Sequence, residues 1–243
     1  MNNSRQIDGV LLVDKASDMT SHDVVAIARR ALRSMGVEKV GHCGTLDPLA
    51  TGLLILTIGK GTKIQDLIMS EDKEYVGTMR LGEVTDSQDA DGEITETRPV
   101  PELSRDELEA AFAKFHGDFY QTPPMVSAIK KDGVPLYKLA RKGQVVEREP
   151  RFVHVYAHEI QAVRMPEIDF RVVCSKGFYV RTYAHDIGES LGCGAHLRAL
   201  RRTKSGKFTV DGAITVDALK NGDVDTILKK IMTLPQVSIL RGA

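Results

Sequence analysis

The stretch GHCGTLDPLATG, residues 41–52, leads directly into the apolar run LLILTIG, residues 53–59. Glycine and the Asp-Pro step are typical of turns, because glycine adopts positive φ and proline fixes φ at an early turn position. An uninterrupted apolar run of this length is typical of a strand that is buried on both faces. We therefore predict a tight loop, carrying Asp47, that is mounted on a buried strand.

Asp47 has a structural and a chemical interpretation. Aspartate followed by proline is a strong signal for a turn or a helix start, and residue type and spacing alone favour that role. A carboxylate on a glycine-flanked loop beside a buried strand is also where a nucleophile or a general base is found. His42 and Cys43 suggest a cysteine–histidine nucleophile, but adjacent residues of a strand point to opposite faces, so this alternative ranks last.

The rest of the chain mixes helical and strand patterns without a strict βαβ order. The expected strands are residues 9–14, 53–59, 75–81 and 168–174, and the expected helices are residues 21–35, 104–116, 181–191 and 223–232. A frayed tail is expected after the last helix. Ser104 and Glu107 form a capping box that marks one helix start. We predict an α/β fold of the α+β type, with helices flanking a mixed, largely antiparallel central sheet.

Two further segments invite a functional interpretation. Gly59–Lys63, GKGTK, resembles a phosphate-binding loop, but the Walker spacing is missing, so a simple turn is favoured. Residues 124–151 are interrupted by prolines and glycines and carry a basic bias, which predicts a loop-rich insertion. Tyr75 begins an expected strand, where an aromatic ring either packs on the sheet or offers a stacking surface to an unstacked base.

Composition narrows the class of protein. The chain has 243 residues, of which 42% are hydrophobic and 27% charged, as in ordinary globular proteins. No apolar run approaches the roughly 18 residues of a membrane span, and no secretory signal is visible. Three widely spaced cysteines without a CxxC pair fit a reducing cytoplasm and give no zinc motif. The net charge is zero, yet residues 194–208 carry basic side chains and no acidic one, so a phosphate-binding patch is compatible with the balance.

Four stretches in order resemble the motifs of the TruB family of tRNA pseudouridine synthases. These stretches are DGVLLVDK at 8–15, GHCGTLDPLATG at 41–52, DKEYVGTMRLGEVTDSQDADG at 72–92 and SKGFYVRTYAHDIGESLGCGAHLRALRRT at 175–203. The second is the most specific, and the invariant aspartate of the family falls on Asp47. A single motif could arise by chance, whereas four in the family order make chance a poor explanation.

The resemblance implies a pseudouridine synthase fold and a reaction. Uridine 55 in the T-loop of tRNA would be cut from its ribose, turned and rejoined through carbon, with no cofactor and no metal. The enzyme would flip the nucleotide out of the loop, because the target cannot be reached inside it. The implied partner is the T-arm of tRNA; we expect no membrane association and a monomer.

The family also implies roles for individual residues. Asp47 is the expected nucleophile, on either the sugar or the base ring, and Arg181 is expected to hold it ionised and oriented. Tyr75 is expected to stack on the flipped uracil. The expected substrate-binding residues are His42, which fills the vacated space or supports the loop, Tyr179 and Leu200, which line the pocket, Asp89 on a polar loop, and Lys15, Lys60, Lys63, Lys130, Lys131 and Arg202, which contact phosphate.

The chain departs from the family pattern in two places. The first motif has Ala16 and Asp18 where the family has proline and glycine, which leaves the role of Lys15 open. After the fourth motif the sequence is too short for the RNA-binding PUA domain of bacterial members. We expect one catalytic domain over residues 1–243, with an insertion at about 124–151 that closes on RNA and no complete PUA domain. A protein that binds or folds tRNA without catalysis is the alternative from another class; it would not need Asp47.

Overall fold

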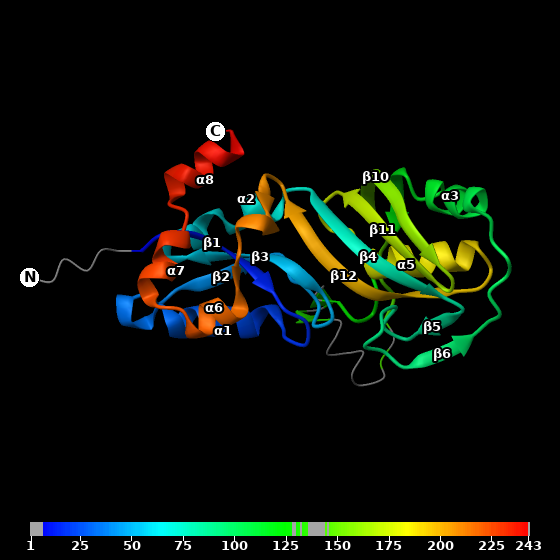
Figure 1. Cartoon of the computed structure of the whole chain (residues 1–243), viewed down its shortest axis with the longest axis horizontal. Coiled ribbons are helices and arrows are strands. Elements are labelled where there is room, and N and C mark those ends of the chain that lie inside the picture. The colour runs from blue at the N-terminus through cyan, green and yellow to red at the C-terminus, as the bar shows by residue number, and fades with distance from the viewer. Residues whose placement is uncertain (1–6, 128–129, 132, 136–143, 145, 243) are drawn as a thin grey trace, which may run out of the picture. The chain divides into compact units, whose positions relative to one another are not determined.

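The computed structural model describes residues 7–127, 130–131, 133–135, 144 and 146–242, and Figure 1 shows the course of the chain. The chain forms two compact units. The first unit comprises Met1–Glu74 and Arg201–Ala243, and the second unit comprises Tyr75–Leu200. Strands β4 (Lys73–Leu81) and β12 (Ala195–Ser205) belong in part to each unit. The expectation of one catalytic domain over the whole chain stays a prediction.

Strand β3 (Thr51–Ile58) is the central strand of the first unit. It runs antiparallel to β1 (Gly9–Lys15) and to β2 (Val40–Cys43), and parallel to the end of β12. From its second residue to its last, β3 is buried, because neighbouring strands and the layers on both faces cover it. This burial explains the uninterrupted apolar run, which the sequence identified as a strand buried on both faces.

Helix α1 (Ser21–Ala31) contacts β2 and α6 (Val216–Asn221), as Figure 1 shows. Thr20 and Asp23 form a capping box at its start. The predicted helix was longer than the observed one. The α-helix ends at Ala31, and a short 3-10 turn, η1, follows before Gly36, which has a φ of 77°.

A hydrophobic cluster joins the strands of the first unit to α2 (Gln65–Met69), β13 (Phe208–Thr209) and α8 (Leu234–Arg241). Its buried members are Val10, Cys43, Leu53, Ile55, Ile68, Phe208 and Val237. Helix α8 has its own capping box, and it contributes to this cluster. The expectation of a frayed tail is therefore wrong, because apolar burial and a capped start both stabilise the last turns.

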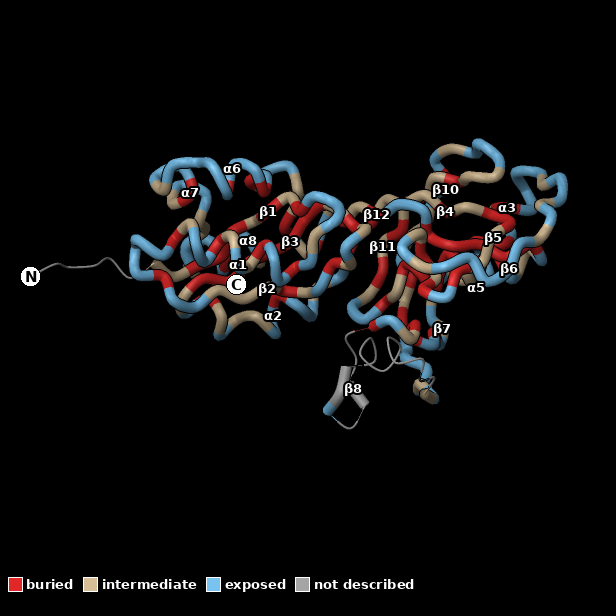
Figure 2. Tube along the Cα trace, turned by 90° about the horizontal axis from the view of Figure 1, so that it is seen from below, coloured by how far each residue is buried: buried red, intermediate tan, exposed pale blue. Residues whose placement is uncertain are grey.

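The remaining elements of the first unit are short. They are η1 (Arg33–Met35), η2 (Gly59–Ile64), η3 (Val210–Gly212), β14 (Ile214–Thr215) and α7 (Val224–Lys230). Strand β14 pairs parallel with β1, and Asp223 caps α7. Figure 2 shows that exposed residues predominate on α6 and α7, whereas the strands carry most of the buried ones.

In the second unit the strands follow the order β4, β11 (Glu167–Cys174), β10 (Arg151–Arg164), β7 (Gly117–Gln121). Strand β10 is antiparallel to both of its neighbours. Burial alternates along β11, as its sequence pattern predicts. Helices α3 (Arg105–Ala113) and α5 (Val180–Ser190) contact each other.

An aromatic core holds α3 and α5 on this part of the sheet. Phe112 of α3, Phe170 of β11 and Tyr183 of α5 meet pairwise, with ring centroids 5.8 to 5.9 Å apart. The rings are inclined to one another by 60° to 86°, which is the edge-to-face arrangement that aromatic pairs prefer. The predicted capping box of Ser104 and Glu107 is present at the start of α3.

Two small sheets complete the second unit: β5 (Glu83–Thr85) pairs with β6 (Ile94–Thr97), and β8 (Lys130–Lys131) pairs with β9 (Val134–Pro135). Much of the predicted insertion at 124–151 lies outside the described residues. Its closure on RNA therefore stays a prediction. The α/β fold with a mixed, largely antiparallel sheet is confirmed. Within the described part of the chain, no helix is both long and apolar enough to span a membrane.

Candidate active site

Asp47 lies in the loop 44–50, between β2 and β3 of the first unit. The main-chain N–H of Ala50 donates to the carbonyl of Asp47 at 3.1 Å, so Asp47 opens a β-turn with Pro48 at its second position. No helix starts here. The preceding residue, Leu46, is fixed by the buried hydroxyl of Ser21, which accepts from its N–H at 2.9 Å and donates to its carbonyl at 3.1 Å. The carboxylate therefore stands on a loop whose main chain is anchored to α1.

Lys15 is fully buried beneath this loop. Its ammonium group donates to the carbonyls of Ala16 at 2.8 Å, Met19 at 2.7 Å and Pro48 at 3.2 Å. The placement favours a loop-holding role over the predicted phosphate contact, because a phosphate would have to replace these bonds. Asp18 has a φ of 60°, and its N–H also donates to the Pro48 carbonyl, at 3.0 Å. Aspartate is among the few residues that tolerate this conformation in place of glycine.

We expect Lys15→Met to lower the free energy of unfolding by about 2 to 4 kcal/mol, since it removes charge-assisted hydrogen bonds from a fully buried ammonium group to three part-buried carbonyls. Urea unfolding followed by circular dichroism measures this change. The control is Lys60→Met, because the Lys60 side chain is 57% exposed and its ammonium forms only a loose ion pair, 3.8 Å from an Asp8 carboxylate oxygen. That control should change stability by less than about 0.5 kcal/mol. Equal, small effects of both substitutions would contradict the holding role of Lys15.

Arg202 supports the other end of the same loop. The side chain is 2% exposed; its Nε donates to the carbonyl of Leu53 at 2.8 Å and its Nη2 to that of Gly44 at 3.1 Å. Gly52, at a φ of 95°, lets the two strands approach: a Cβ there would lie 2.3 Å from the Arg202 carbonyl oxygen. This burial favours a structural role for Arg202 over the phosphate contact that was predicted.

His42 and Cys43 face different surroundings, as their strand positions predict. The His42 ring meets His22 edge-on, with centroids 5.2 Å apart. Burial, followed by the positive charges of His22 and Arg202, lowers the pKa of His42, which favours the neutral imidazole. Cys43 lies in the hydrophobic cluster, where burial raises the pKa of its thiol to about 12. A protonated, buried thiol argues against the cysteine–histidine hydrolase.

We expect the folded protein to resist thiol alkylation, because Cys43, Cys174 and Cys193 are all buried. Incubation with iodoacetamide at pH 8 and intact-mass measurement should show less than one adduct per chain. The same treatment in denaturant should modify all three thiols, which serves as the control. Rapid modification of Cys43 in the folded protein would revive the hydrolase alternative.

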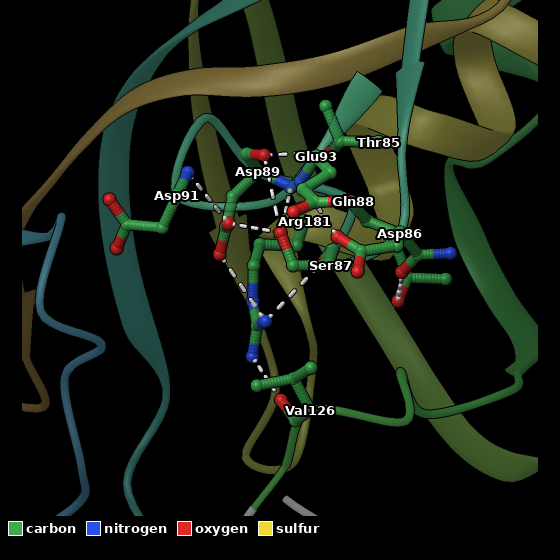
Figure 3. A network of polar contacts seen from close by, with 10 residues as sticks. Thr85, Asp86, Ser87, Gln88, Asp89, Asp91, Glu93, Val126 and Arg181 are labelled. Carbon is green, nitrogen blue, oxygen red and sulfur yellow. Dashed lines mark hydrogen bonds and ion pairs between the residues drawn. The ribbon is translucent and has the colours of Figure 1, made fainter. Parts of the chain in front are cut away.

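In the second unit, Asp89 and Arg181 form a buried ion pair, and Figure 3 shows the surrounding contacts. The Asp89 Oδ2 atom lies 3.3 Å from Nη1 of Arg181, and each side chain is 4% exposed. The Ser87 hydroxyl donates to Oδ1 of Asp89 at 2.5 Å, and the Asp91 N–H donates to the same oxygen at 3.1 Å. These donors stabilise a buried carboxylate that would otherwise carry a large desolvation cost.

The Arg181 guanidinium also binds two main-chain carbonyls. Its Nη1 donates to Ser87 at 3.2 Å and its Nη2 to Val126 at 2.7 Å. The planar side chain thus joins the loop 85–91, the segment at Val126 and the start of α5. Acceptors from these segments therefore hold the planar guanidinium in one orientation.

The remaining predicted site residues are divided between the two units. Tyr75 is 9% exposed on β4 and Leu200 is 8% exposed on β12, both within the second unit. Tyr179 precedes α5, and the Gln121 side chain fixes it by accepting from its N–H at 2.8 Å and donating to its carbonyl at 3.0 Å. Lys60 and Lys63 are exposed on η2.

Lys130 and Lys131 form β8; their side chains are outside the described part.

Asp47 belongs to the first unit and Arg181 to the second, so their pairing stays a prediction. The motifs pointed to Asp89 and Arg181 but missed the residues that support the site. Ser87 binds Asp89, Gln88 binds Thr182, and Gln121 binds the main chain of Tyr179. The partners of Gln88, Gln121 and Thr182 lie far away in sequence, so these residues carry no local motif.

Two family models together match residues 30–233. Residues 30–180 match the TruB family pseudouridylate synthase N-terminal domain, and residues 181–233 match the tRNA pseudouridylate synthase B C-terminal domain. The chain belongs to the TruB family. The resemblance seen in the four motifs is therefore confirmed, and with it the enzyme class, an isomerase.

TruB-family relatives match this chain closely over most of its length. A tRNA pseudouridine synthase B of Opitutus terrae is 56% identical over 234 residues, which cover 96% of each chain. The enzyme of the same name from Burkholderia lata is 52% identical over 219 residues, 90% of this chain and 67% of the relative. A chain in the crystal structure of a Cbf5-Nop10-Gar1 complex superimposes with a TM-score of 0.72 at 30% identity. The match covers 96% of this chain and 62% of that one, and it confirms the pseudouridine synthase fold.

Proposed function

We propose that this protein converts uridine 55 in the T-loop of tRNA to pseudouridine, with Asp47 as the nucleophile and with the target base flipped out of the loop. The observation that supports the proposal most directly is the way in which the loop that carries Asp47 is anchored. The main chain of its loop is anchored by Ser21, Lys15 and Arg202, so that a carboxylate is presented from a rigid turn. The names of the relatives, tRNA pseudouridine synthase B, support tRNA as the substrate.

The reaction breaks one bond and forms another without oxidation or reduction. The bond between N1 of the uracil and C1′ of the ribose breaks, the base turns, and C5 joins C1′. C5 loses its proton and N1 gains one, so the atoms balance. The Asp47 carboxylate would form a transient covalent bond either to the sugar or to the base ring, and would be regenerated at the end. A group that attacks in this way must be ionised and held in place, which a fixed cation such as Arg181 favours.

The neighbouring residues have corresponding proposed roles. Tyr75 stacks on the flipped uracil, and Leu200 and Tyr179 line its pocket. His42, neutral at the edge of the Asp47 loop, stacks in the space that the base vacates or supports the loop. The exposed Lys60 and Lys63 are the better candidates for phosphate contact, because Lys15 and Arg202 are buried. Contacts of this kind fix position and give salt dependence rather than sequence specificity.

Incubation with an unmodified tRNA transcript, followed by carbodiimide modification and primer extension, tests the proposal. We expect one new stop that maps to position 55 and is absent when that uridine is replaced by cytidine. Pseudouridine at another tRNA position would keep the enzyme class and overturn the site. Tight tRNA binding without any pseudouridine would favour the alternative, a protein that folds tRNA without modifying it.

A further inference from the structure

Gln88 has an unusual backbone conformation at the centre of the loop 85–91. Its φ is 65°, and among the described residues other than glycine only Asp18 shares a positive φ. Glutamine has no side-chain feature that favours this left-handed region, unlike glycine, asparagine or aspartate. A residue keeps such a conformation only when its surroundings determine it, and this often occurs at functional sites.

The surroundings that determine Gln88 come from two elements. The Thr182 hydroxyl, on α5, donates to the Gln88 side-chain oxygen Oε1 at 2.8 Å, a contact that is buried on the threonine side. The Leu197 N–H, on β12, donates to the Gln88 carbonyl at 3.0 Å, and the Ala90 N–H returns a bond of 3.0 Å to the Leu197 carbonyl. The loop is thus fixed through its side chain to the helix and through its main chain to the strand.

Two contacts between the loop and α5 lie next to each other. Gln88 immediately precedes Asp89, and Thr182 immediately follows Arg181, so the neutral Gln88–Thr182 bond adjoins the Asp89–Arg181 ion pair. The ion pair itself is 3.3 Å long and buried, and a desolvated pair needs good geometry to be favourable. In Figure 3, Gln88, Asp89 and Ser87 all belong to the short loop that meets Arg181.

We infer that Gln88 and Thr182 form a tether that positions Asp89, and through it Arg181, for the isomerisation of uridine. Both are positioning residues, since neither is required to touch the substrate. The inference rests on the proposed function, because it assumes that Arg181 serves the reaction. The left-handed turn at Gln88 directs the next side chain, Asp89, toward the helix, and the tether keeps the turn from relaxing.

The test is a double-mutant cycle on the full-length chain. Thr182→Val removes the donor at nearly constant volume, and Gln88→Gly removes the acceptor while it still permits positive φ. Each should lower the single-turnover rate about tenfold, the effect of losing one buried hydrogen bond, with tRNA affinity changed less than about twofold. The double variant should be no slower than the slower single variant, and Thr182→Ser, which keeps the hydroxyl, should restore the rate.

Hydrogen exchange supplies a readout that needs no turnover. Both Thr182→Val and Gln88→Gly should speed amide exchange in the peptide that covers residues 85–91, by at least about fivefold. Thr78→Val is the matched control, because its hydroxyl donates to Asp169 at 2.7 Å between β4 and β11, outside the loop. This control should leave both the loop exchange and the rate unchanged. Gln88 is only half-buried, so Gln88→Gly is expected to fold. If Thr182→Val fails to fold, the rate and the loop exchange of Gln88→Gly test the inference.

The outcomes separate the two proposals. Additive rate effects in the cycle, or unchanged loop exchange in both single variants, would overturn the tether. A wild-type chain that makes no pseudouridine, but whose loop exchange rises in both variants, would overturn the proposed function and leave the tether standing. A general structural role would instead lower tRNA affinity and rate together and would not be rescued by Thr182→Ser.

Discussion

Asp47→Asn is expected to abolish pseudouridine formation, with a loss of more than about ten-thousandfold in the single-turnover rate. The amide has the size of the carboxylate but lacks the negative charge, so its oxygen is a much weaker nucleophile. The fold of the loop should survive, because Ser21, Lys15 and Ala50 bind main-chain atoms, and asparagine suits the first position of a turn as well as aspartate does. Pseudouridine mapping on an unmodified transcript measures the loss.

Binding separates this result from misfolding. We expect Asp47→Asn to bind the transcript within about threefold of the wild-type affinity in a filter-binding titration, since the pocket keeps its shape. Asp66→Asn is the matched control: it removes an exposed carboxylate on α2, in the same unit, and should keep full activity. Ordinary turnover by Asp47→Asn would end the assignment of the nucleophile.

Arg181→Lys should lower the single-turnover rate by about a hundredfold, although the charge is conserved. The guanidinium reaches Asp89, the Ser87 carbonyl and the Val126 carbonyl from two nitrogen atoms of one rigid plane. A lysine ammonium is a single point on a flexible stem, and it cannot keep the same set of contacts in a site that is 4% exposed. At least one buried carbonyl would lose its donor.

Arg98→Lys provides the control for this substitution. Arg98 also binds carboxylates through its planar fork, those of Glu96 and Glu189, but at the surface of the second unit. We expect its rate to stay within about twofold of wild type, because exposed ion pairs contribute little. If Arg181→Lys and Arg98→Lys both turned over normally, the orienting role of Arg181 would be refuted.

The sequence predicted the elements whose signals are local. The apolar run of β3, the capping box of α3 and the alternation of β11 each occupy a few consecutive residues, and each element formed. Helix α8 was mispredicted as a frayed tail, although the sequence signal for its start is equally local. Thr233 and Gln236 form a capping box, and Pro235 lies in the first turn. Apolar burial of α8 then depends on distant partners, which no local pattern reveals.

The site was predictable in its residue types and not in its contacts. Asp47, Asp89 and Arg181 could be found from motifs, but the burial of Lys15 depends on Pro48, 33 residues away in sequence. Lysine beside a polar turn is ordinarily exposed, which was consistent with the phosphate contact that the family resemblance implied for Lys15. The positive φ of Gln88 was equally hidden, because it results from Thr182 and Leu197 rather than from glutamine itself.

The carbonyl contacts of Lys15 have a consequence for how this family can diverge. The ammonium group binds Ala16, Met19 and Pro48 through atoms that every amino acid possesses, so the side chains at these positions are largely free to drift. A replacement such as Ala16 for the usual proline leaves the acceptor in place. Substitutions at positions 16 and 19 therefore leave the main-chain acceptors of Lys15 in place, whereas position 18, with a φ of 60°, is restricted to glycine, asparagine, aspartate and the few other residues that tolerate positive φ.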